Sequence, residues 1–151
     1  MDIKVAVQAA PFSMDYGYSD ALVGRSDIGA VVSFTGLVRD FNETPDVTGL
    51  TLEHYPGMTE RTLTEIGEQA CQRWSLQAVR IIHRVGYLGP GDPIVRVLVA
   101  SAHRREAFEA CDFIMDFLKT QAPFWKKEHS TRGEYWVKER HSDQQDAARW
   151  E

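Results

Sequence analysis

Two segments with a helical spacing of apolar residues constrain the fold of this chain more than any other feature. They cover residues 59–74 and 104–120, and Pro123 ends the second. The apolar positions are Leu63, Ile66, Ala70 and Trp74 in the first segment, and Ala107, Cys111, Ile114 and Leu118 in the second. An apolar stripe of this kind must be buried, so each helix needs another layer of structure to pack on.

Short runs rich in β-branched residues supply that layer. They lie at about 3–7, 30–38, 50–55, 79–85 and 94–100. The segment Gly86-Tyr-Leu-Gly-Pro-Gly-Asp92 predicts a hairpin-like turn between the last two runs. The order is strands, helix, strands, helix, without strict alternation. This order favours an α+β fold with a largely antiparallel sheet.

The other segments are predicted as a loop and a short tail. Residues 42–49 form a polar loop that could be mobile, and a Tyr-Trp-Val strand follows Glu134. Ser142 is a plausible cap for a final one or two turns of helix. No repeat or linker divides the 151 residues, so we expect one domain spanning 1–151.

Composition excludes several classes of protein. No apolar run approaches the roughly 20 residues that span a bilayer, and the N-terminus does not read as a secretory signal, so we expect a cytoplasmic protein. Cys71 and Cys111 fall on apolar helix faces, where a thiol usually packs as a small hydrophobe and not in a disulfide. The net charge of −5 argues against a general nucleic-acid coat.

The cationic residues are unevenly distributed in this acidic chain. Four of its five lysines lie in the C-terminal third, close to several arginines. The residues concerned are Arg104, Arg105, Lys119, Lys126, Lys127, Arg132, Lys138 and Arg140. This concentration points to a local site for an anion.

Ser101-Ala-His-Arg-Arg105 stands where a buried strand passes into a helix. A helix N-terminus attracts anions but disfavours cations, so two arginines there break a local rule, which hints at a site. The alternative is that both arginines pair with Glu106, Glu109 or a nearby loop. His103 is a candidate phosphate donor or proton carrier, although a lone histidine is more often structural.

Lys119 and Lys126 are the candidate reactive amines. Lys119 in a last helical turn is equally explained by the helix dipole. Lys126 follows Ala-Pro-Phe-Trp, whose aromatic residues should anchor it with Lys127 and Glu128 near the helix end. Amines held in one pocket repel each other, which lowers the pKa of one of them and suits it to nucleophilic or acid/base chemistry. A solvated basic face is the alternative.

Thr35-Gly-Leu-Val-Arg39 ends another buried strand, and Arg39 suits a phosphate or carboxylate, although a surface ion pair would look the same. The chain has no Walker-type loop, no dinucleotide fingerprint and no Gly-x-Ser-x-Gly motif, and its five histidines lack ligand spacing. We therefore expect no bound metal and no cofactor. The residues alone predict an anion pocket lined by Arg39, His103, Arg104, Lys119, Lys126 and Lys127.

Three segments together resemble the molybdopterin synthase large-subunit family. They are Leu52-Glu-His-Tyr-Pro-Gly-Met58, Ser101-Ala-His-Arg104 and Met115-Asp-Phe-Leu-Lys-Thr-Gln-Ala-Pro-Phe-Trp-Lys-Lys-Glu128, in the order and spacing of that family. The resemblance runs from about residue 11 to 150. It implies an α/β hammerhead-type fold and a homodimer. It also implies a small ubiquitin-like sulfur-carrier subunit at each end, which makes a heterotetramer.

The resemblance also implies a sulfurtransferase. Its substrate would be cyclic pyranopterin monophosphate, and its two dithiolene sulfurs would come from the thiocarboxylated Gly-Gly tail of the carrier. By position, Lys119 and Lys126 become the catalytic pair. The substrate and tail site is then lined by Leu37, Val38, Arg39, His103, Arg104, Lys119, Lys126, Lys127 and Glu128. Many relatives carry a lysine where this chain has Leu37, so only a backbone contact is expected from Leu37 or Val38.

Two other functions fit parts of the sequence. A non-catalytic adaptor would use the basic C-terminal region to dock a ubiquitin-like partner. A single-stranded nucleic-acid module would use the aromatic and cationic residues of Pro-Phe-Trp-Lys-Lys and Tyr-Trp-Val-Lys. Turnover of the pterin precursor separates the first from an enzyme, and salt-dependent oligonucleotide binding would indicate the second.

Overall fold

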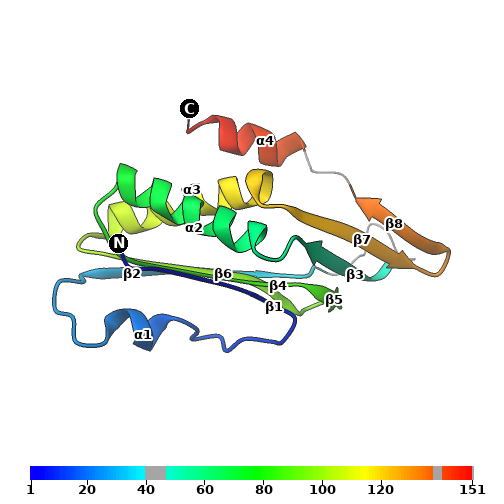
Figure 1. Ribbon diagram of the computed structural model, residues 1–151, viewed down its shortest axis with the longest axis horizontal. Coiled ribbons are helices and arrows are strands. Elements are labelled where there is room, and N and C mark those ends of the chain that lie inside the picture. The colour runs from blue at the N-terminus through cyan, green and yellow to red at the C-terminus, as the bar shows by residue number, and fades with distance from the viewer. Residues whose placement is uncertain (40–46, 138–140, 151) are drawn as a thin grey trace.

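A computed structural model of the chain describes residues 1–39, 47–137 and 141–150 (Figure 1). Its elements are β1 (Ile3–Gln8), α1 (Tyr18–Leu22), β2 (Ala30–Leu37), β3 (Val47–His54), α2 (Met58–Arg73), β4 (Leu76–Arg84), β5 (Gly86–Leu88), β6 (Pro93–Ser101), α3 (Arg104–Gln121), β7 (Phe124–Ser130), β8 (Gly133–Val137) and α4 (His141–Ala148). The strands form two four-stranded sheets. Only one described strand pair, β1 with β4, is parallel, so the predicted α+β class with mainly antiparallel sheets is confirmed.

The first sheet has the strand order β1-β4-β6-β2 and carries the main core. Helices α2 and α3 cover one of its faces, and α1 lies on the other (Figure 1). The predicted helical stripes form the core with alternate residues of β4 and β6, including Val79, Ile81, Val97 and Val99. The helices are therefore held by burial of their apolar stripes, as their spacing predicted.

The second sheet has the order β5-β3-β7-β8 and lies beyond the C-terminal end of α3 (Figure 1). Strand β3 leads into α2 and strand β7 follows α3, so this sheet continues the layer formed by the two helices (Figure 1). A small cluster of Val38, Leu50, Leu52 and Leu88, joined by Ile94, packs between the two sheets. The junction of the two sheets thus lies where α3 ends.

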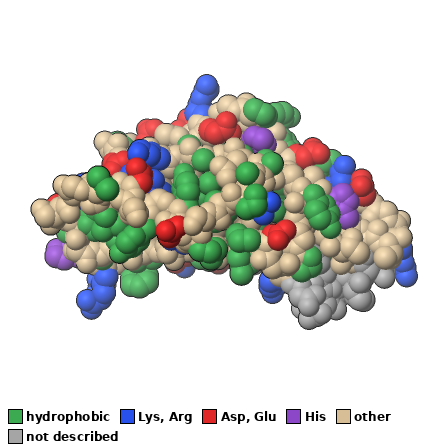
Figure 2. Space-filling model, turned by 90° about the horizontal axis from the view of Figure 1, so that it is seen from below, with side chains coloured by type: hydrophobic (Ala, Val, Ile, Leu, Met, Phe, Trp, Pro, Cys, Tyr) green, Lys and Arg blue, Asp and Glu red, His purple; other side chains and the backbone are tan. Residues whose placement is uncertain are grey.

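The α1 side of the first sheet is held by paired charges. The Arg80 side chain is 2% exposed, and its guanidinium lies 2.7 Å from Asp20 and 2.9 Å from Asp2. Lys4 and Arg80 hold the pKa of the Asp20 carboxyl below its ordinary value. Figure 2 shows cationic and anionic side chains scattered over this face, without a patch of one sign. The face is therefore a poor candidate for an anion site.

Several predicted boundaries were wrong. Strand β3 begins at Val47, inside the expected 42–49 loop, while residues 42–46 of that loop lie outside the described ranges. The expected 86–92 turn contains the short strand β5, which pairs with β3 in the second sheet. The strand β7 and the short helix α1 were not predicted. Helix α4 begins at His141, so Ser142 lies within it and does not precede it. Residues Lys138 and Arg140 lie outside the described ranges.

The cysteines behave as their positions predicted. Cys71 is partly exposed, Cys111 is buried, and both are free thiols. Burial raises the pKa of both, that of Cys111 to about 12, so neither is a ready nucleophile. Among the helices of the described ranges, none has the length and apolar character needed to cross a membrane.

Candidate active site

The C-terminal end of α3 presents Lys119 to solvent in the last turn. Pro123 then stops the helix, and the chain enters β7 at Phe124. The turn is fixed from α2, because the buried Thr59 hydroxyl donates to the Pro123 carbonyl at 3.3 Å and accepts from the Tyr55 amide at 3.1 Å. Lys119 and the first residues of β7 are therefore held at one junction.

Strand β7 turns its side chains alternately to the two faces of the second sheet. Lys126 is paired with Leu52, and Glu128 with Leu50. Both leucines are buried against the first sheet, so Lys126 and Glu128 share the face that is turned toward it. Lys126 is half-buried there. This places the second candidate amine on the same side of the molecule as the end of α3.

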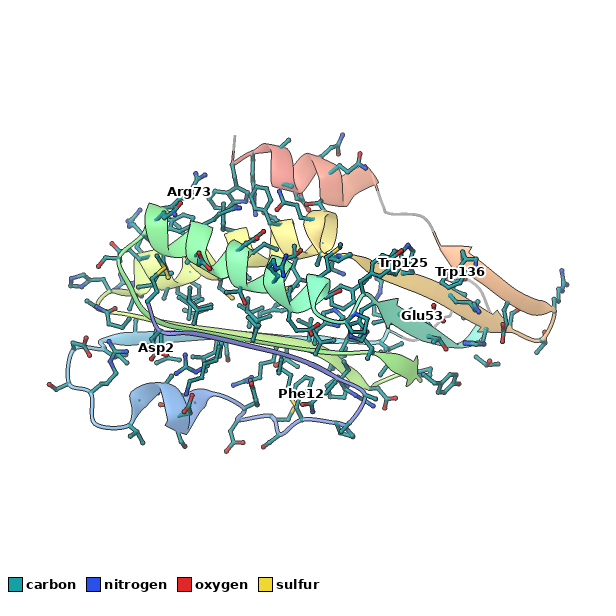
Figure 3. The ribbon with its side chains drawn as sticks, viewed as in Figure 1. Asp2, Phe12, Glu53, Arg73, Trp125 and Trp136 are labelled. Carbon is teal, nitrogen blue, oxygen red and sulfur yellow. The ribbon has the colours of Figure 1, made fainter. Side chains whose placement is uncertain are left out.

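Lys127 points to the opposite face of the second sheet. Its ammonium lies 3.6 Å from a Glu134 carboxylate oxygen and 4.7 Å from the centre of the Trp136 ring. Trp136 and Trp125 lie together over this sheet (Figure 3), and both line a shallow hollow with Tyr55. The expectation that Lys126 and Lys127 share one pocket was wrong, because consecutive strand residues face opposite sides.

The end of β2 carries the third group of candidate residues. Leu37 is 51% exposed, whereas Val38 is buried in the cluster between the sheets. The Val38 amide donates to the Asp92 carbonyl at 2.9 Å, and its own carbonyl accepts from Gly91 at 2.7 Å. Its backbone is thus engaged, which leaves Leu37 as the better source of a backbone contact. Arg39 follows and is exposed.

The N-terminal end of α3 forms a separate open hollow of about 680 Å³. It is lined by Gly29, Ala30, Ala102, His103, Arg104, Arg105, Phe108 and Glu109. Within the described ranges neither the Arg104 nor the Arg105 side chain makes a hydrogen bond or ion pair, and the Glu109 carboxylate accepts instead from Trp74 at 2.9 Å. The alternative that these arginines simply pair with neighbouring acids is therefore wrong for the described residues.

The predicted single pocket is divided between the two ends of α3. Lys119 follows Arg104 by fifteen positions, which corresponds to about 22 Å along a helix axis. Strand β2 runs the same way, from Ala30 opposite Ser101 to Leu37 opposite Pro93. Arg39 therefore belongs to the Lys119 end, and His103 and Arg104 to the other. One chain does not bring these groups together.

Sequence reasoning missed one residue at the Lys119 end. His83 ends the buried run of β4, is only 5% exposed, and stacks on Phe124 with ring centres 3.9 Å apart. The signal was a histidine inside an otherwise apolar strand. Burial, helped by the charges of Lys119 and His54, lowers its pKa to about 4, so the ring is neutral near pH 7.

Comparison with known proteins identifies the family. Residues 7–121 match the model of the family described as MoaE protein. This chain belongs to the MoaE protein family. The molybdopterin synthase catalytic subunit of Vibrio cholerae is 56% identical to it over 151 residues, which cover 100% of both chains.

Solved structures of MoaE proteins share the fold. The molybdopterin biosynthesis MoaE protein of Burkholderia ambifaria matches with a TM-score of 0.84 and 43% identity, over 99% of this chain and 98% of that one. A chain from the protein–protein complex of subunits 1 and 2 of the Helicobacter pylori molybdopterin-converting factor matches with a TM-score of 0.73 over 91% of each chain. At 19% identity it supports the fold alone. The predicted family is confirmed, and with it an enzyme of molybdenum cofactor biosynthesis.

Proposed function

We propose that this chain works in the cytoplasm as the catalytic subunit of a molybdopterin synthase, with Lys119 and Lys126 as its reactive amines. It would convert cyclic pyranopterin monophosphate to molybdopterin, with both sulfurs supplied by the thiocarboxylated C-terminus of a small ubiquitin-like carrier. One observation carries the assignment of residues. Two amines from different elements, α3 and β7, lie at the same sheet junction, and Lys126 is on the face turned toward it.

The lysines suit the chemistry of sulfur transfer. Each thiocarboxylate sulfur displaces an oxygen of the substrate to form a thioester, which water then cleaves to leave the sulfur on the pterin and a carboxylate on the carrier. Negative charge develops on the departing oxygen in the first step and on the carrier's carbonyl oxygen in the second. An ammonium group at that position stabilises the charge and can deliver a proton. Glu128 lies on the same face as Lys126 and can accept a proton or orient an amine. Lys127 interacts with Trp136 and Glu134 on the other face, so we place it outside the reacting centre.

The phosphate of the substrate requires the arginines, and these lie at both ends of α3. Arg39 is at the lysine end, whereas His103 and Arg104 are about 22 Å away. A substrate the size of a pterin monophosphate does not span that distance. We therefore propose a homodimer in which His103 and Arg104 of a second copy complete the site formed by Arg39, Lys119 and Lys126.

The free edge of the first sheet supports this arrangement. Strand β2 is an edge strand in the described sheet, and its sequence Ala-Val-Val-Ser-Phe-Thr-Gly-Leu contains no charged residue. Phe34 and Leu37 on it and Phe108 beside it are 41%, 51% and 60% exposed. An uncharged edge is a template for pairing. Two copies that met antiparallel along β2 would place the Ala30 end of one at the Leu37 end of the other.

Turnover tests the proposal directly. The purified chain, mixed with thiocarboxylated carrier and cyclic precursor, should form molybdopterin. Lys119→Ala should abolish product formation while the carrier still binds, as measured by titration calorimetry. If the wild-type chain binds the carrier but forms no product under any condition, the adaptor function is correct and the enzyme assignment is wrong.

A further inference from the structure

His83 lies in the floor of the junction from which both candidate lysines extend. It stands on β4, paired with Val7 of β1 and Val95 of β6, and its ring points toward the helix-covered face, as Val79 and Ile81 do. No step of the proposed reaction uses it. Yet a buried imidazole in a strand of aliphatic residues has a desolvation cost that a leucine would avoid.

The ring has a defined tautomer and a defined neighbour. The Nδ1 atom lies 2.8 Å from the Arg84 carbonyl oxygen, and a carbonyl only accepts, so Nδ1 carries the hydrogen and Nε2 is unprotonated. The ring plane is 20° from that of Phe124 at 3.9 Å, a close stack. The hydrogen bond sets the orientation of the His83 ring, and the ring in turn sets the position of Phe124.

Phe124 links this contact to the reacting amines. It is the first residue of β7, two positions before Lys126 on the same face, and five positions after Lys119. In the next strand His54 is its pairing partner, and the His54 Nε2 atom lies 3.9 Å from Glu60 of α2. A shift of Phe124 would therefore move the start of β7 relative to the end of α3, and with it the separation of the two amines.

We infer that His83 is a positioning residue, which holds Phe124 and through it keeps Lys126 opposite Lys119. This inference rests on the proposed function, since it concerns the same pair of lysines. A neutral aromatic ring suits this place, because it stacks without adding a further cation beside Lys119. Positioning errors of about 1 Å can cost up to about 100-fold in rate, so the effect should be large enough to measure.

The test compares His83→Ala, His83→Phe and Val79→Ala. We expect His83→Ala to lower kcat about tenfold or more with KM for the precursor within about threefold, because the amines are misplaced while the phosphate contacts remain. His83→Phe keeps a stacked ring and should restore most of the rate. Val79→Ala removes buried atoms from the same strand and face, about 13 Å away, and should leave kcat within about threefold.

Two further measurements keep the inference testable if His83→Ala folds poorly or the reaction fails. Phe124→Leu keeps bulk but not the stack, and should reproduce the loss of kcat. Hydrogen exchange of the Phe124–Ser130 amides, read by mass spectrometry, should speed up in His83→Ala and not in Val79→Ala. If wild type forms no molybdopterin, the proposed function is wrong, and the exchange rates still decide whether His83 holds β7. Unchanged exchange, or equal kcat in His83→Ala and Val79→Ala, would overturn the inference.

Discussion

The two ends of α3 both carry cations, but the helix dipole favours those at one end and disfavours those at the other. At its C-terminus Lys119 sits where the helix dipole favours a cation, beside a half-buried Lys126 and a buried neutral imidazole. At its N-terminus Arg104 and Arg105 sit where the dipole disfavours cations, and no described residue pairs with them. The first end holds its amines at a junction fixed by packing, with Lys119 exposed to solvent. The second is an open, positively charged hollow, as expected of a surface that receives an anion held by something else.

The difference teaches how the site is divided. The helix keeps the two ends about 22 Å apart, and in the homodimer we propose the anion-binding end of one chain serves the reacting end of the other. Each of the following changes acts on one end, or on one face at one end, and should leave the other intact.

The largest effect should come from Lys126, with Lys127 as its matched control. Lys126→Ala should lower kcat by about 100-fold or more, because it removes a charge next to the developing oxyanion. Lys127→Ala should stay within about threefold, because its ammonium faces Glu134 and Trp136 on the opposite side of the sheet. Steady-state formation of molybdopterin measures both. Equal losses would mean that the two faces of β7 are not functionally distinct.

The second effect concerns the stability of the Lys119 end. The pKa of His83 is lowered from 6.5 to about 4, so the unfolded chain binds this proton more tightly. Above about pH 6.5 this group does not lower the free energy of unfolding. As the pH falls toward 4 the free energy of unfolding decreases, and at pH 5 it is about 2 kcal/mol lower. The groups that face the ring are Lys119, His54 and the uncharged Phe124.

Urea unfolding at pH 7 and pH 5 measures this loss. His83→Phe should lack this part of the difference between the two pH values. Val79→Ala should be less stable at both pH values but keep the wild-type difference. A His83→Phe variant with the same pH dependence as wild type would show that His83 does not titrate as described.

The smallest of the three effects is expected at the N-terminal end. Arg104→Ala should raise KM for the phosphate-bearing precursor about tenfold and change kcat less, because a charge-assisted contact to phosphate is lost in ground state and transition state alike. Arg104→Lys should recover part of the affinity, since a lysine restores the positive charge but not the paired N–H donors of a guanidinium. Kinetics that vary precursor concentration at saturating carrier provide the measurement. A loss confined to kcat would move Arg104 from binding into the chemistry.

The main helices and strands could be predicted from sequence because the apolar residues in each follow one clear spacing. The stripes of α2 and α3 and the β-branched runs of β4 and β6 bury one another, so local pattern and tertiary burial agree. Strand β7 has no such pattern, since Phe-Trp-Lys-Lys-Glu-His-Ser alternates neither in size nor in polarity. It is a strand only because β3 and β8 pair with it. The short strand β5 likewise depends on pairing with β3, more than 30 positions earlier in the chain.

The candidate site, like the fold, could be predicted only in part. The types of residue could be chosen from sequence, but their grouping could not. One available signal was overlooked, since Arg104 and Lys119 stand in the same predicted helix and its length alone separates them. The opposite facing of Lys126 and Lys127 required β7 to be recognised as a strand. The role inferred for His83 depends on its stack against Phe124, a contact between residues 41 positions apart that no local pattern encodes.

A mixing experiment tests the central claim, that each site takes its amines from one chain and its anion-binding residues from another. Lys119→Ala chains, which should form no product, and Arg104→Ala chains, which should keep about a tenth of the wild-type rate at precursor concentrations below KM, are combined, unfolded and refolded together, and assayed at such a concentration. Random pairing makes about half of the dimers mixed, each with one intact site of two, so about a quarter of wild-type activity should return. If the mixture is no more active than the two variants measured separately, the shared site is wrong.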